Sequence, residues 1–142
     1  MAMTEDERLR SEPACARLCH DFAAAVDARQ YDAFVALFAA DGVFDRAGQA
    51  SHGHAEIRRF LDARPADRVT RHVCTNIRID LAGLDSGTGS CYALVFQAQS
   101  PDAAVQPLPT PVPMVVEYHD DYQCGPQGWR FRHRRVKIIF QP

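Results

Sequence analysis

The spacing of apolar residues changes only once along this chain, from a helical period in the first half to a strand period in the second. In the first half, an apolar stripe with the spacing of one helix face is formed by Cys15, Leu18, Cys19, Phe22 and Val26. From Val69 onward, apolar residues alternate with polar ones, which is typical of half-buried strands. Helices followed by a run of strands favour an α+β fold over a doubly wound one, in which the two would alternate.

The first half is expected to begin with a long helix. Ser11 is suited to cap it, with Glu12 and Pro13 in its first turn. Residues 1–10 would then form an N-terminal extension. A second, short helix is expected over about 32–38.

A third helix and a short strand complete the first half. Ala40-Asp41-Gly42 is expected to end the second helix, and residues 43–45 to form the strand. Residues 48–53 favour a turn, and the third helix is expected over about 55–63, stopped by Pro65.

The second half predicts an antiparallel meander. The expected strands span about 69–79, 88–99, 114–122 and 129–140. In the first of them, alternation places Val73, Thr75, Ile77 and Ile79 on one face and His72, Cys74, Asn76 and Arg78 on the other. Residues 80–87 and 124–128 read as hairpin connections, whereas the proline-rich residues 100–113 predict a loop or an extended edge.

Length and composition limit the class of protein. A chain of 142 residues is long enough for one domain, expected over 1–142, with a small-molecule pocket. Its 16 basic and 18 acidic residues give a net charge of −2, which argues against nucleic-acid binding. No apolar run approaches roughly 18 residues, so no membrane span is expected. The acidic N-terminus has no apolar signal region, and the five cysteines have no disulfide framework spacing, so we expect a cytoplasmic protein with free thiols.

Two residues are candidates for general-base chemistry. His72 opens a strand, and imidazole can take up a proton near neutral pH. Asp27 lies in the last turn of the first expected helix, at the border of its apolar stripe. A carboxylate bonded to one ring nitrogen would fix the tautomer and stabilise the imidazolium that forms. The alternative is a solvated helix-end acid and a half-buried strand histidine.

Arg134 is the candidate for charge stabilisation. Strict alternation in the last strand would give Arg134 the same face as the apolar Val136, so either a bulge resets the strand or its first half exposes the face that its second half buries. In a pocket, its guanidinium could hold a leaving group or an oxyanion. The alternative is a solvated basic face, and the run His119-Asp120-Asp121 is likewise expected at a solvated rim.

Metal binding has two candidate places, one at Cys15, Cys19 and His20 and one at His52 and His54. The two cysteines already belong to the apolar stripe, and no second paired set has the spacing of a zinc site, so no metal is predicted. The sequence has neither a glycine-rich phosphate loop nor a nucleophile elbow, so no cofactor is expected.

Four stretches together carry a family resemblance, namely 25–32 with 38–44, 53–57, 71–77 and 128–135. Over roughly residues 10–140, the chain resembles the SnoaL-like branch of the nuclear transport factor 2-like superfamily. The resemblance implies a cone-shaped α+β barrel, in which a highly curved, mainly antiparallel sheet is closed by three N-terminal helices around a deep apolar pocket. It also implies a homodimer or homotrimer.

Within that superfamily, the site positions are most similar to those of scytalone dehydratase and hexachlorocyclohexane dehydrochlorinase. The resemblance places Asp27 and His72 on the aspartate and histidine that both enzymes use. Arg134 falls on an arginine of the dehydrochlorinase, whereas Phe22 stands where that enzyme has a lysine.

We therefore expect a cofactor-independent lyase acting on a small apolar cyclic molecule. His72 would take a proton from carbon, Asp27 would orient it, and Arg134 would steady the leaving group or enolate. Substrate-binding candidates are Asn76, Tyr92, Phe96, Met114 and Tyr118. The alternatives are an isomerase or cyclase using the same proton transfer, and a non-catalytic binding or assembly module like the β subunit of ring-hydroxylating dioxygenases.

Overall fold

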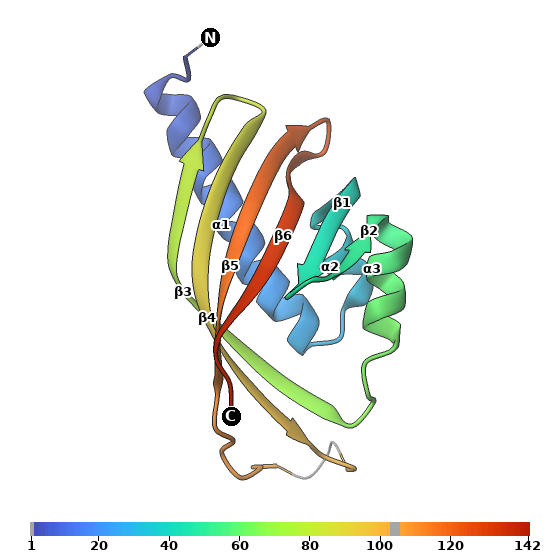
Figure 1. The fold of residues 1–142 in the computed structure, drawn as a ribbon. Coiled ribbons are helices and arrows are strands. Elements are labelled where there is room, and N and C mark those ends of the chain that lie inside the picture. The colour runs from blue at the N-terminus through green and yellow to red at the C-terminus, as the bar shows by residue number, and fades with distance from the viewer. Residues whose placement is uncertain (1, 103–105) are drawn as a thin grey trace.

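Residues 2–102 and 106–142, which the computed structural model describes, form a strongly curved six-stranded sheet with three helices on one side (Figure 1). The helices are α1 (Glu5–Asp27), α2 (Tyr31–Val35) and α3 (Gly53–Asp62). The strands are β1 (Phe38–Arg46), β2 (Gln49–His52), β3 (Arg68–Leu81), β4 (Ser86–Gln99), β5 (Met114–Gly125) and β6 (Gly128–Phe140). The expected α+β class is confirmed, as are the third helix and the four long strands to within a few residues.

The sheet follows the order β2-β1-β6-β5-β4-β3. β1 runs parallel to β6, and the other neighbouring pairs in the described ranges are antiparallel. The helix α1 crosses the sheet and packs against β3 and β6, whereas α3 packs against β1 and β2 (Figure 1). The C-terminal end of α1 therefore comes close to the start of β3.

A β-hairpin stands where the sequence predicted a helix end, a three-residue strand and a turn. Phe38, expected in the second helix, instead begins β1. The hairpin turn uses Ala47 (φ 51°) and Gly48 (φ 96°), and positive φ at both positions matches the twist of paired strands. The carboxylate of Asp45 accepts a 2.8 Å hydrogen bond from the Gly48 N–H, which closes the turn.

The first helix begins seven residues before the expected first turn. Thr4 caps it by accepting a hydrogen bond from the backbone N–H of Glu7, whose carboxylate accepts one from the backbone N–H of Thr4. This reciprocal capping box satisfies two donors that a helix start leaves unpaired. The predicted cap at Ser11 is therefore wrong, and Pro13 lies inside the helix.

Replacing Thr4 by alanine should destabilise the protein by about 1 kcal/mol, because the helix loses its side-chain cap. Urea unfolding measures this change. Ser11→Ala is the matched control, since Ser11 lies within the helix, and it should change stability by less than about 0.5 kcal/mol. A larger cost for Ser11→Ala than for Thr4→Ala would contradict the observed helix start.

The core is a cluster of phenylalanines between α1, α2, β1 and β6. Phe22, Phe34 and Phe44 are each at most 5% exposed, and the ring centroids of Phe22 and Phe34 lie 4.6 Å apart. Phe38 and Phe131 extend the cluster, with centroids 5.2 Å apart. Because these rings come from distant parts of the sequence, they fix the position of α1 over the sheet.

Two bulges change which residues face inward. In β3 the register shifts between Thr75 and Arg78, and Asn76 has a φ of 53°. The predicted unbroken alternation is therefore wrong, because the bulge adds one residue and turns Ile77 to the side that Cys74 faces. In β6 the register shifts beyond Phe131, which confirms the first of the two options for that strand, a bulge.

The proline-rich connection lies along the outer side of β3 and β4. Pro107, Leu108 and Pro109 line an open cavity there together with Val73 and Phe96. The described part of the connection is irregular, as expected, and residues 103–105 lie outside the described ranges. In the part of the chain that the structure describes, no helix combines the length and apolar character needed to cross a membrane.

Candidate functional site

A cavity of about 220 Å³ lies between the C-terminal end of α1, α3 and the inner face of the sheet. Its walls are mainly apolar and include Phe22, Phe44, Phe60, Val116 and Tyr118. Its polar lining residues are Arg46, Arg64, Arg68, Thr70, His72 and Gln97. This combination of an apolar enclosure with a few polar groups is typical of a small-molecule site.

Asp27 is hydrogen-bonded to His72, which lines this cavity. The Nδ1 atom of His72 donates to Oδ1 of Asp27 at 2.7 Å, since a carboxylate can only accept. The backbone N–H of His72 donates to the other carboxylate oxygen at 2.8 Å. The side chains are 12% and 13% exposed for His72 and Asp27. Within residues 2–102 and 106–142, Nε2 of His72 has no hydrogen-bond partner, so it is the ring nitrogen left to act on a ligand.

A residue that was not predicted from the sequence completes this arrangement. The hydroxyl of Thr70, which is 4% exposed, donates a 2.8 Å hydrogen bond to Oδ1 of Asp27. Thr70 and His72 point to the same side of β3 because they are two residues apart on a strand. Strand alternation could have identified Thr70 once His72 was chosen.

The hydrogen bonds determine the charge state of Asp27. Partial burial raises its pKa, but the bonds from the side chain and backbone of His72, and from Thr70, outweigh burial and lower the pKa below the ordinary value. Asp27 is therefore a carboxylate near neutral pH. In that form it accepts the hydrogen bond from Nδ1 of His72 and so fixes the orientation of the ring.

Arg29 connects the helix end to the strand that carries His72. It follows α1 with a left-handed φ of 57°, so the chain turns sharply after Asp27. Its guanidinium donates to the carbonyl oxygens of Pro65 and Arg68 and, at 3.1 Å, to the hydroxyl of Tyr31. These bonds tie the α1–α2 turn to the start of β3 and so hold Asp27 opposite His72.

Acid should destabilise the protein partly through Asp27. Because its folded-state pKa is lowered, the carboxylate adds stability above the ordinary value of about 3.9, and this is lost as the pH falls through the folded-state pKa. The free energy of unfolding should therefore fall more from about pH 5 to about pH 3 in the wild type than in Asp27→Asn. Urea unfolding at both pH values tests this. Asp21→Asn, an exposed acid on the same helix, should keep the wild-type fall; equal falls in wild type and Asp27→Asn would contradict the assignment.

The predicted substrate-binding residues divide into two groups. Met114 and Tyr118 line the cavity. Asn76, Tyr92 and Phe96 do not line it, so their role in substrate binding stays a prediction. Asn76 is exposed in the bulge of β3. Tyr92, 47% exposed, and Phe96 face the outer side of β4, because the small residues that alternate with them fill the inner side.

Arg134 does not line the cavity but packs against two residues that do, Phe22 and Tyr118, so its contact with a leaving group or oxyanion stays a prediction. Its side chain is fully buried and forms a two-bond ion pair with Asp120, at 2.8 and 3.0 Å. The rings of Phe22, Tyr118 and Phe131 surround the guanidinium at 4.0–4.4 Å, which offsets part of its desolvation. The ion pair with Asp120 holds the pKa of Arg134 well above its ordinary value despite burial.

Asp120 was predicted at a solvated rim and is instead 2% exposed. Its register partner on β6 is Arg134, and it follows the inward side of β5 set by Tyr118 and Tyr122. The alternation of residues along β5 therefore placed Asp120 on the same side as Tyr118 and Tyr122. The acid could not be assigned inward because its buried partner was not known.

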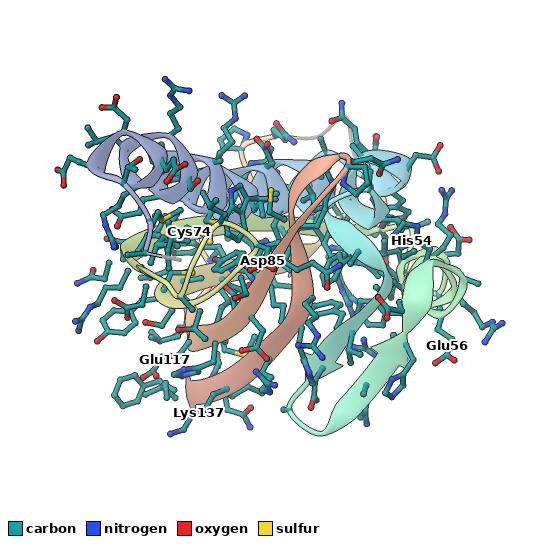
Figure 2. The ribbon with its side chains drawn as sticks, turned by 90° about the horizontal axis from the view of Figure 1, so that it is seen from above. His54, Glu56, Cys74, Asp85, Glu117 and Lys137 are labelled. Carbon is teal, nitrogen blue, oxygen red and sulfur yellow. The ribbon has the colours of Figure 1, made fainter. Side chains whose placement is uncertain are left out.

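The cysteines lie between α1 and the sheet. Figure 2 shows Cys74 below α1, where its thiol donates to the carbonyl oxygen of Cys19 at 3.7 Å. All five thiols are free, and burial raises the pKa of Cys15 to about 12, so that thiol stays protonated. His54 and Glu56 lie on α3, well away from Cys74 (Figure 2), and the ring of His54 bonds the Phe38 carbonyl oxygen at 2.8 Å.

Comparisons with solved structures show the same fold. The chain is 18% identical to a proposed scytalone dehydratase from Novosphingobium aromaticivorans, covering 96% of this chain and 89% of that one with a TM-score of 0.83. It is 19% identical to a hexachlorocyclohexane dehydrochlorinase from Novosphingobium barchaimii, covering 96% and 92% with a TM-score of 0.79. It is 23% identical to a protein of unknown function from Mycobacterium tuberculosis, covering 99% and 79% with a TM-score of 0.83.

A comparison with curated proteins finds no match to this sequence. The sequence profile of one domain family, the SnoaL-like domain, matches residues 7–135, which include most of α1, both residues of the Asp27–His72 contact and most of β6. The chain belongs to the SnoaL-like domain family.

Proposed function

We propose that this protein is a cofactor-independent lyase that removes a proton and a leaving group from a small cyclic substrate. One observation carries the proposal, which is the contact between the His72 ring and the Asp27 carboxylate beside a mostly apolar cavity. A base in such a cavity is shielded from water, so its proton transfer is directed to the bound molecule.

In this mechanism Nε2 of His72 takes a proton from a substrate carbon. The electrons of the broken C–H bond form a carbon–carbon double bond, and the leaving group departs with its own bonding pair. Asp27 stabilises the imidazolium through the 2.7 Å hydrogen bond to Nδ1. The imidazolium can then return its proton to the leaving group. Thr70 donates to the same carboxylate oxygen, Oδ1, and so helps to hold the carboxylate in place.

The names of two structural neighbours support elimination as the reaction class. A dehydratase removes water and a dehydrochlorinase removes hydrogen chloride, and both reactions begin at a carbon–hydrogen bond next to the leaving group. At 18% and 19% identity these neighbours share the fold with this chain, so the reaction stays our proposal.

The direct test uses 5-nitrobenzisoxazole, a small neutral aromatic molecule whose ring opens by elimination when a base removes its carbon-bound proton. The product absorbs visible light, so the rate is read by spectrophotometry. We expect the wild-type protein to exceed an equal concentration of free imidazole by at least about 100-fold. A rate no higher than that of free imidazole would contradict a usable base in the cavity.

Product analysis separates elimination from isomerisation once a natural substrate is found. In heavy water, a lyase product lacks the leaving group, whereas an isomerase product keeps every group and gains deuterium. The homodimer or homotrimer and the cytoplasmic location stay predictions, and light scattering of the purified protein tests the first.

A further inference from the structure

Three arginines line the cavity beside His72 without an acidic partner. Arg46 comes from the end of β1, Arg64 from the segment after α3, and Arg68 from the start of β3. Within residues 2–102 and 106–142, no carboxylate lies within ion-pair distance of any of them. Elsewhere in the same ranges, five arginines do have such partners, namely Arg8, Arg17, Arg58, Arg134 and Arg135.

Arg46 is held firmly at the cavity wall. Its guanidinium carbon lies 3.6 Å from the ring centroid of Phe60, and one nitrogen donates to the Ser51 hydroxyl at 3.0 Å. Burial lowers its pKa, an effect that the charge of nearby Asp45 opposes. The stacked ring fixes the plane of the guanidinium, so its remaining donors are preorganised for a planar acceptor.

The other two arginines line the same cavity. Arg64 donates to the Tyr31 hydroxyl at 2.8 Å and to the Val26 carbonyl oxygen at 3.2 Å, which are neutral groups. The side chain of Arg68 makes no hydrogen bond or ion pair within the described ranges, so all its donors are open. These three positive charges outnumber the single negative charge of Asp27, which His72 and Thr70 already bind.

We propose that Arg46, Arg64 and Arg68 select substrates that carry a carboxylate on an apolar ring. A guanidinium in an apolar, partly desolvated site binds a carboxylate most strongly, because a carboxylate accepts two of its hydrogen bonds in one plane. The phenylalanine walls fit the ring, and the arginines fit its anionic group. The proposal rests on the proposed function, because it names the substrate class of the same cavity.

The test compares 2-naphthoate with 2-naphthamide, which have nearly the same shape and differ in charge. Binding of each to the full-length protein is measured by isothermal titration calorimetry. We expect the carboxylate to bind at least about 10-fold more tightly than the amide, with a preference that falls as salt is added. Equal affinities, or no binding of either compound up to about 1 mM, would overturn the proposal.

Variants assign the preference to the arginines. Arg68→Gln should reduce the preference for the carboxylate to about 3-fold or less, and it removes no contact that holds the fold. Arg46→Gln should do the same, and Arg46→Lys, which keeps the charge, should retain part of the preference. Arg17→Gln, an exposed arginine on α1, is the matched control and should bind like the wild type. A full preference in both glutamine variants would overturn the proposal.

His72→Ala separates this proposal from the proposed function. This substitution removes the base but none of the three arginines. The variant should therefore keep the preference for naphthoate over naphthamide and lose elimination of 5-nitrobenzisoxazole. If elimination fails in the wild type but the preference is present, the cavity binds organic anions without acting as a lyase. If elimination succeeds and no preference is found, the proposed lyase function is retained and the proposed selection of carboxylate substrates is rejected.

Discussion

Replacing His72 by alanine should lower the rate of 5-nitrobenzisoxazole elimination by roughly 10²–10⁴, while the melting temperature should change by only a few degrees. The rate falls because the variant has no nitrogen in the cavity that can take the proton. The fold persists because Asp27 keeps hydrogen bonds from Thr70 and from the backbone of residue 72. Initial rates and differential scanning calorimetry measure the two quantities.

Asp27→Asn tests the partner in the same assay. An amide cannot stabilise the imidazolium as a carboxylate does, so we expect a similar loss of roughly 10²–10⁴. His119→Ala is the matched control for His72, because His119 is an exposed histidine on β5 that contacts Glu117. If His119→Ala and His72→Ala lowered the rate equally, the cavity histidine would not be the base.

The largest effect on stability is expected from Asp120→Asn. The substitution leaves the positive charge of Arg134 fully buried with no acidic partner. Breaking one side of a buried ion pair costs about 3–5 kcal/mol, which for a chain of this length lowers the melting temperature by roughly 10 °C. Urea unfolding and calorimetry measure both changes.

The neighbouring residue provides the control for this prediction. Asp121 also pairs with an arginine, Arg135, but these side chains are 37% and 44% exposed. Asp121→Asn should therefore cost less than about 1 kcal/mol. Equal costs for the two substitutions would mean that the Asp120 pair is not a buried ion pair in solution. Asp120→Leu combined with Arg134→Met should recover part of the loss, because it removes both charges.

The fold could be predicted because its apolar periodicity is strong in both halves of the chain and agrees with the family resemblance. The helix start was misplaced because Glu12 and Pro13 resemble a first turn, while the true capping box at Thr4 and Glu7 lies outside the apolar stripe. The hairpin after α2 was missed because its second strand, β2, has only four residues and Ala47, which adopts a positive φ, gives no sequence signal of a turn.

The site was predictable only in part. Asp27 and His72 were chosen for their chemistry and positions, and the resemblance supported the pair, but their contact depends on tertiary packing that no local pattern specifies. Tyr92 and Phe96 share one side of β4, and the sequence did not show which side faces inward; the buried side is that of Ala93 and Val95. The arginine cluster was missed because its members are far apart in sequence and belong to three different segments.

Because of the bulge at Asn76, the two halves of β3 contact different parts of the protein. Before it, Thr70 and His72 serve the cavity; after it, Ile77 and Ile79 lie against the N-terminal part of α1. Deleting Asn76 would restore strict alternation and turn those two isoleucines out into water, detaching the front of the helix from its support. Thr70 and His72 would still face the cavity. The extra residue therefore lets one strand supply both the site residues and the residues that support α1, with the orientation of each set independent of the other.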